Sequence, residues 1–209
     1  MKKQVEKEHY DFSKYMSKKR WCSVWHQLDE VLQLQPERVL EVGPGPGLFK
    51  SVAQSYGLTI TTVDIAEDLN PDIVASATCI PVADNSYDVV CSFQMLEHLP
   101  FEVSLDAFRE MARVAKSHIV ISLPDAEVRW PYSFYVPKIG IKTVLLKRPR
   151  LKVRDHEFDG EHYWEINKKG FELEYILSNL LSLDEAFELA KTYRVPENPY
   201  HRFFVFKMK

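Results

Sequence analysis

Apolar and polar positions follow one another along the first half of the chain with periods that predict helices and strands in turn. Residues 14–34 carry apolar side chains at three- and four-residue intervals, which predicts an amphipathic helix that ends before Pro36. Short apolar runs predict strands at 38–42, 59–63, 72–75, 87–93 and 118–123. Helices are predicted between them at 48–56 and 101–115. This alternation indicates a parallel sheet covered by helices, an α/β fold.

The regular pattern stops after Pro124 and returns near residue 168. Residues 124–165 contain four prolines and a reversal of charge, which predicts a long irregular segment that is either functional or disordered. Seven basic residues and no acid lie between Lys138 and Arg154, and five acids without Lys or Arg follow up to Glu165. Beyond this segment, a helix is predicted at 168–180 and strands at 181–189 and 202–207.

The stretch "EVGPGPGLF", residues 41–49, joins a predicted strand to a predicted helix through three glycines. Such a turn lets the backbone approach a ligand and directs helix N–H groups at an anion. A Walker A loop would need Lys and Ser or Thr after the glycines, and a dinucleotide fingerprint would need Gly or Ala where Leu48 stands. A nucleoside with an amino-acid tail remains, and Glu41 could pair with its cationic amino group.

Three motifs in order resemble one enzyme family. "VLEVGPGPG", "TTVDI" and "IPVADNSYDVVCSFQMLEHLP" are similar to the motifs of class I S-adenosylmethionine-dependent methyltransferases, in particular the branch called methyltransferase type 11. The resemblance covers roughly residues 39–123, and the terminal "RFFVFKMK" suits the last strand of the family. It implies a single-domain, Rossmann-like, seven-stranded, mostly parallel sheet with helices on both faces and an antiparallel last strand.

The resemblance also implies which residues bind S-adenosylmethionine and release S-adenosylhomocysteine. Glu41 would act indirectly on the ammonium of the methionine tail, and Asp64 would bind the ribose hydroxyls. Ile65 would pack on the adenine, and Gln94 would face the sulfonium end. The backbone contacts would come from Gly43, Gly45 and Gly47.

The adenine pocket departs from the family pattern. An acid usually stands where this chain has Ser76, followed by Ala77 and Thr78. Adenine recognition would therefore fall to Ser76, to Thr78 or to backbone groups. This departure leaves an alternative open, a methyltransferase-like binding module or partner subunit without its own turnover.

The methyl acceptor is expected to contact residues 124–165 and the N-terminal helix. Histidines titrate near neutral pH, so His98, His156 and His162 are the candidates for a general base that deprotonates the acceptor. No metal site is expected, since an HExxH motif is absent and two of these histidines stand six positions apart. The predicted organisation is one domain, 1–209, divided into the lid helix 14–34, the cofactor core 38–123, the insertion 124–165 and the C-terminal part 166–209.

Charge and short motifs limit the classes of molecule that this chain is expected to bind. A net charge of −3 gives no reason to expect nucleic-acid binding, and the absence of a "YxxxK" pair argues against a short-chain dehydrogenase. The expected acceptor is a hydroxyl, amine or carboxylate of a small molecule, a sugar or a lipid-linked intermediate. The basic, partly apolar segment 138–154 also permits peripheral contact with a membrane. No secretory signal is recognisable in the first residues, which predicts a cytoplasmic protein.

Overall fold

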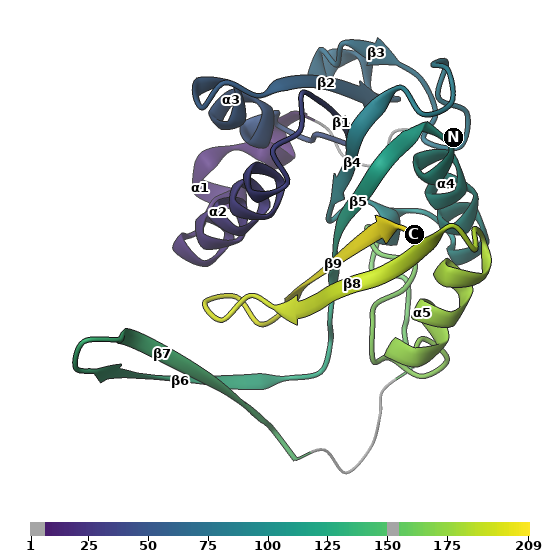
Figure 1. Ribbon diagram of the computed structural model, residues 1–209. Helices are drawn as coiled ribbons and strands as arrows, with labels where there is room; N and C mark the ends of the chain where they lie inside the picture. Colours follow the sequence, from purple (N-terminus) through teal and green to yellow (C-terminus); the bar gives the residue numbers. More distant parts are fainter. Residues whose placement is uncertain (1–6, 150–154) are drawn as a thin grey trace.

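A seven-stranded mixed sheet forms the centre of the computed structural model, which describes residues 7–149 and 155–209. Its strand order is β3-β2-β1-β4-β5-β9-β8 (Figure 1). The strands are β1 Arg38–Val42, β2 Thr59–Asp64, β3 Ile73–Val74, β4 Tyr87–Phe93, β5 Ala115–Pro124, β8 Phe187–Arg194 and β9 His201–Met208. The first five in this order pair in parallel, and β9 runs antiparallel to both of its neighbours. The predicted fold class is confirmed.

Helices cover both faces of this sheet (Figure 1). One face is covered by α2 Lys18–Gln33 and α3 Leu48–Ser55, preceded by η1 Lys7–Tyr10 and α1 Phe12–Tyr15. The other is covered by α4 Phe101–Val114 and α5 Leu173–Ser182. Two short 3-10 helices, η2 Glu67–Leu69 and η3 Leu96–His98, follow strands β2 and β4. Two buried apolar clusters result, one on each side of the sheet.

The predicted helix at 14–34 is interrupted near its start. Residues 12–15 form α1, and a new helix begins after Ser17, whose hydroxyl accepts a hydrogen bond from the Arg20 N–H at 3.2 Å. A serine in this extended conformation is a favoured N-cap, because it pairs an N–H that the helix leaves free. The break turns the aromatic residues before it toward the glycine turn.

The prediction that residues 124–165 lack regular structure is wrong for their first half. Residues 129–136 and 140–147 form an antiparallel hairpin, β6 Arg129–Val136 and β7 Gly140–Lys147. The hairpin extends away from the sheet in Figure 1. Pro131 had argued against a strand, but in a two-stranded ribbon every second N–H faces solvent, so a proline is tolerated. The turn uses Lys138 and Gly140, both at positive φ. Residues 150–154 of the predicted basic segment lie outside the described residues.

Two boundaries near the C-terminus also differ from the prediction. The helix expected from residue 168 begins at Leu173, because the chain first turns through Gly170 at φ 84°. The strand expected at 181–189 begins only at Phe187, since Leu181 still belongs to the helix. Apolar residues on the last helical turn produced the same pattern as a strand.

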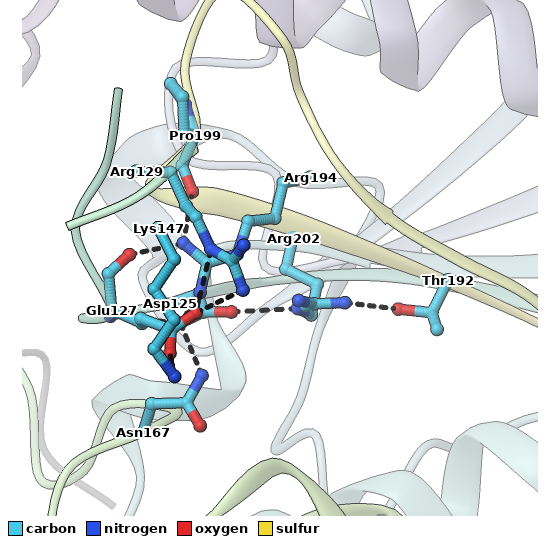
Figure 2. Close-up of polar contacts among 9 residues, drawn as sticks. All are labelled: Asp125, Glu127, Arg129, Lys147, Asn167, Thr192, Arg194, Pro199 and Arg202. Atoms are coloured by element: carbon cyan, nitrogen blue, oxygen red, sulfur yellow. Dashed lines mark hydrogen bonds and ion pairs between the residues drawn. The ribbon is translucent and has the colours of Figure 1, made fainter. Parts of the chain in front are cut away.

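A buried charge cluster fastens the base of the hairpin to the sheet (Figure 2). Asp125, at the end of β5, pairs with Arg194 of β8, and its other oxygen accepts from Arg202 Nε of β9 at 2.8 Å. Glu127 pairs with Arg129 and Lys147, one from each hairpin strand. Asp125 is fully buried, so these partners compensate a charge that would otherwise be expensive to desolvate.

Within the described residues, the structure contains no helix that is both long enough and apolar enough to cross a membrane.

Candidate active site

A cavity of about 640 Å³ opens where β1, β2 and β4 end. Gly43, Asp64 and Gln94, each at the carboxyl end of one of these strands, line it. In an open α/β sheet this edge is the expected place for a ligand. Residues distant in sequence close the cavity, namely Tyr10, Tyr15, Arg20, His162, Tyr163, Tyr200 and His201.

The glycine turn needs glycine at two of its three positions for reasons of space. Gly43 and Gly45 have φ values of 71° and 53°, which side chains rarely adopt. A Cβ on Gly43 would lie 2.3 Å from Met95 Cγ, and one on Gly45 would lie 3.2 Å from the Tyr10 ring. Gly47 has φ 69° and caps α3, with no atom within 4 Å of where its Cβ would lie. The turn therefore presents bare backbone to the cavity wall.

Glu41 lies behind this turn as a buried carboxyl group. Its Oε2 has no hydrogen-bond partner among the described residues, and the side chain contacts a smaller cavity that Gly43, Pro44 and Gln94 also line. Burial raises the pKa of Glu41 to about 8, while Lys50 acts in the opposite direction. A buried carboxyl group with one unpaired oxygen beside bare backbone suits a cationic amino group, so the residues present fit the amino-acid end of S-adenosylmethionine.

Asp64 ends β2 and faces the main cavity. Its Oδ1 accepts a hydrogen bond from the Ala66 N–H at 2.8 Å, and burial raises the pKa of its carboxyl group above the usual range. Ile65, which is 37% exposed, lines the cavity beside it. The structure thus brings together the acid and the apolar residue that the sequence predicted for the ribose and the adenine.

Two of the three residues predicted for the adenine pocket lie in the cavity wall. Ser76 and Ala77 line the cavity, whereas Thr78 is not part of the wall that the described residues form. The Thr78 hydroxyl lies 2.9 Å from the Ser76 hydroxyl, and the Thr78 N–H donates to Ser76 Oγ at 3.2 Å. Thr78 therefore orients Ser76 from behind.

Gln94 follows β4 in a left-handed conformation, with φ 54°. Its Nε2 donates to Ser122 Oγ at 3.2 Å, and its backbone N–H donates to the Ser122 carbonyl at 2.9 Å. These bonds fasten the start of the loop to β5 and place Gln94 and Met95 in the cavity wall.

The three predicted histidines are not equivalent in the structure. His98 and His162 line the cavity with their ring centroids 5.0 Å apart. His156 is not part of the cavity wall; its Nε2 lies 2.8 Å from the His162 carbonyl, so it supports the loop from behind. Burial and the neighbouring His162 lower the pKa of His98 to about 4. Burial also opposes charge on His162, but the carboxylates of Glu165 and Glu97 raise its pKa above the usual value.

Several residues at the site carried weak signals or none in the sequence. Glu97 is fully buried, and neither of its oxygens has a hydrogen-bond partner among the described residues. Arg20 and His201 also line the cavity, although they lie at opposite ends of the chain. No local motif marks them, because only the folded chain brings the N-terminal helix and the last strand to the same edge. Away from the site, near the start of β4, the Asp88 carboxylate accepts hydrogen bonds from the N–H groups of Glu37 and Arg38 at 3.0 and 2.8 Å.

Comparison with known proteins agrees with this geometry. A family model described as a methyltransferase domain matches residues 12–196. A curated relative, the ubiquinone biosynthesis O-methyltransferase of Bordetella avium, is 30% identical over 132 residues, which are 56% of this chain and 54% of the relative. The chain thus spans about half the length of that relative.

Solved structures share the whole fold at low identity. A methyltransferase dependent on S-adenosylmethionine from Aquifex aeolicus superimposes with a TM-score of 0.61 at 16% identity, covering 98% of this chain and all of that one. The magnesium protoporphyrin IX methyltransferase of Synechocystis, solved with S-adenosylhomocysteine, gives 0.60 at 14% identity over 91% and 84% of the two chains. With its family match, its sheet order and its glycine turn, the chain belongs to the methyltransferase domain family, within the class I S-adenosylmethionine-dependent methyltransferases.

Proposed function

We propose that this chain transfers the methyl group of S-adenosylmethionine to a hydroxyl group of a small molecule. The cofactor part rests on one observation: Glu41 is a buried carboxyl group with an unpaired oxygen, behind a turn that Gly43 and Gly45 keep free of side chains. The preference for oxygen over nitrogen rests on the similarity to curated O-methyltransferases.

The cofactor side of the cavity would be formed by the ends of three strands. Glu41 would act on the ammonium of the methionine tail, and Asp64 would accept hydrogen bonds from the ribose hydroxyls. Ile65, Ser76 and Ala77 would surround the adenine. When bound, S-adenosylmethionine supplies an electrophilic methyl group, whose carbon bonds to the acceptor oxygen while sulfur keeps the electron pair of the broken bond.

The acceptor side would be formed by η3, by the loop 155–165 and by the N-terminal segment. Tyr15 and Tyr163 supply apolar ring surface there, and His98 and His162 are its polar groups. Rings exclude water and hold a flat or apolar acceptor, while the histidines bind and orient its hydroxyl. Holding the acceptor oxygen in line with the methyl carbon can lower the activation free energy by roughly several kcal/mol, as in other reactions between oriented groups.

Calorimetric titration with S-adenosylhomocysteine tests the cofactor site. We expect one molecule to bind per chain, and Asp64→Ala to weaken binding about 10- to 100-fold, since it removes charge-assisted hydrogen bonds each worth about 1.5–3 kcal/mol. Glu67→Ala, an exposed change on neighbouring η2, is the matched control and should bind like the wild type. If the wild type does not bind, or Asp64→Ala binds equally well, the cofactor assignment is wrong.

Transfer of labelled methyl groups tests the acceptor. Panels of phenols, alcohols, sugars, lipid-linked hydroxyl compounds, amines and carboxylates are incubated with methyl-labelled S-adenosylmethionine. Label on a hydroxyl oxygen supports the proposal, and label confined to nitrogen or to a carboxylate oxygen contradicts it. Cofactor binding without transfer to any fraction of a cell extract would support the alternative, a binding module.

A further inference from the structure

Glu97, His98 and His162 form a cluster at the acceptor side of the cavity that the methyl donor does not account for. One ligand atom of each residue lies within 4.8 Å of those of the other two. Glu97 and His98 are adjacent on η3, and His162 comes from the loop on the other side. We propose that these three side chains bind a divalent transition-metal ion, with Zn²⁺ as the ion that fits them best.

The carboxylate of Glu97 is the first observation that points to an ion. Its side chain is fully buried, and neither oxygen has a hydrogen-bond partner among the described residues. Buried polar atoms in folded proteins are nearly always paired, so two unpaired carboxyl oxygens beside two imidazoles indicate that a ligand of this cluster is missing.

The hydrogen bonds of the two histidines supply the second observation. His98 Nδ1 lies 3.0 Å from the Glu161 carbonyl, which can only accept, so Nδ1 carries the proton and Nε2 keeps its lone pair. His162 Nδ1 lies 3.0 Å from Glu165 Oε1 and donates its N–H to that carboxylate, which leaves Nε2 as the atom available to an ion. Metal-binding histidines typically donate their other N–H to a carbonyl or a carboxylate in this way.

The loop that carries His162 is held firmly against η3. The Tyr163 N–H donates to the Glu97 carbonyl at 2.8 Å, and Trp164 Nε1 donates to the Leu99 carbonyl at 3.1 Å. Glu165 is oriented in turn by the Tyr200 hydroxyl and by Lys168. The three ligands thus come from two segments whose relative position is set by backbone and side-chain bonds.

A second acidic group nearby is a weaker candidate. Asp159, His162 and Glu165 also lie within reach of one another. However, Asp159 already accepts from the N–H groups of Glu161 and His162, and Glu165 is already paired. Only the cluster with Glu97 contains an unpartnered ligand, so it is the one assigned.

Two imidazoles and one carboxylate are the ligand set of several catalytic zinc sites, which keep a fourth position open. His98 and His162 both line the cavity, so that position would face the acceptor. The role of the ion rests on the proposed function: it would hold the acceptor hydroxyl and ease loss of its proton to water before the oxygen bonds to the methyl carbon. Binding of the ion itself does not depend on that function.

The test is titration of the chelator-treated full chain with ZnCl₂ by calorimetry, and with CoCl₂ by visible absorption. We expect one ion per chain and the absorption bands of a tetrahedral cobalt site. Glu97→Gln, which keeps the shape of the side chain, should weaken Zn²⁺ binding roughly 100-fold or more, beyond the 10- to 100-fold typical of losing an outer partner. Glu165→Gln should weaken it by about that smaller factor.

Asp159→Asn is the matched control and should bind Zn²⁺ like the wild type. The proposal is overturned if the wild type binds no Zn²⁺, if Glu97→Gln binds it equally well, or if Asp159→Asn loses it. Titration of every variant with S-adenosylhomocysteine shows whether it is folded. It also separates the two proposals, because the cofactor can bind a chain that binds no metal.

Discussion

At the scale of single residues, Glu41 should give the proposed cofactor site a pH dependence. Burial raises its pKa to about 8, so the carboxyl group is mainly protonated at pH 7 in the free protein. A cationic amino group stabilises the ionised form, so binding must release a proton. We expect the affinity for S-adenosylhomocysteine to rise from pH 6 to pH 8, by up to about tenfold per pH unit. Calorimetry at several pH values measures this slope.

Glu41→Gln is the control for that slope, because an amide of the same shape does not titrate in this range. The variant should bind more weakly at pH 8 and should show a flatter dependence on pH. Calorimetry in buffers of different ionisation enthalpy should detect roughly one proton released at pH 7 by the wild type and fewer by the variant. A wild-type affinity that stays constant from pH 6 to pH 8 would show that Glu41 does not ionise on binding.

At the scale of elements, the charge cluster of Figure 2 joins four segments through one buried carboxylate. Asp125→Asn would leave Arg194 and Arg202 without their main counter-charge, and Arg194 is almost fully buried. Breaking such a pair from one side costs about 3–5 kcal/mol. We expect the free energy of unfolding, measured with urea, to fall by about that amount.

Thr192→Val provides the comparison. Thr192 Oγ1 accepts only a long hydrogen bond from Arg202 Nη1, at 3.3 Å, so its loss should cost about 1 kcal/mol or less. If the two variants lose equal stability, the pairing of Asp125 does not hold the hairpin base and the last strands together.

Strand β7 belongs to the segment 138–154 for which the sequence predicts peripheral membrane contact, and the aromatic side chains of β6 extend the same surface. Trp130, Tyr132 and Phe134 are about half exposed on one face, and no acid occurs between residues 128 and 154. Aromatic rings beside lysines suit an anionic lipid surface. We expect the protein to sediment with vesicles rich in phosphatidylglycerol at low salt and less so at high salt.

Replacing the three rings with serine should abolish sedimentation while leaving affinity for S-adenosylhomocysteine unchanged, because they lie outside the cavity wall. Sedimentation that persists in this variant, or a wild type that stays in solution at low salt, would remove the hairpin as a membrane contact.

The sequence predicted the parallel part of the sheet well, because strands buried on both faces leave continuous apolar runs, as in Tyr87–Phe93. The sequence did not predict the hairpin β6–β7. A hairpin outside the core keeps no single buried face, so its prolines and lysines concealed two strands. His98 and His162 were both candidates, but their meeting depends on bonds between η3 and a loop more than 60 residues away. No local sequence pattern predicts that contact. Glu97 became a candidate ligand only because the structure leaves both of its oxygens without a hydrogen-bond partner among the described residues.

At the scale of the whole molecule, the N-terminal segment closes the crevice that the strands leave open. His9, Tyr10 and Tyr15 pack edge to face, with ring centroids 5.0–5.5 Å apart, and the Arg20 guanidinium lies 3.9 Å above the Tyr15 ring. None of the side chains from residue 9 to residue 16 is fully buried. The segment therefore contributes little to the core and covers the cavity instead.

If the N-terminal segment covers the ligand and does not support the core, a substitution in it should change affinity but not stability. Tyr10→Ala should weaken binding of S-adenosylhomocysteine about tenfold, the equivalent of about 1.4 kcal/mol, because it removes a ring that lines the cavity above Gly45. Its melting temperature should stay close to that of the wild type, since the ring is not part of either core cluster. Phe12→Ala, at an 80% exposed position two residues later, should change neither quantity. If Tyr10→Ala lowers the melting temperature but not the affinity, the segment belongs to the fold and does not cover the ligand.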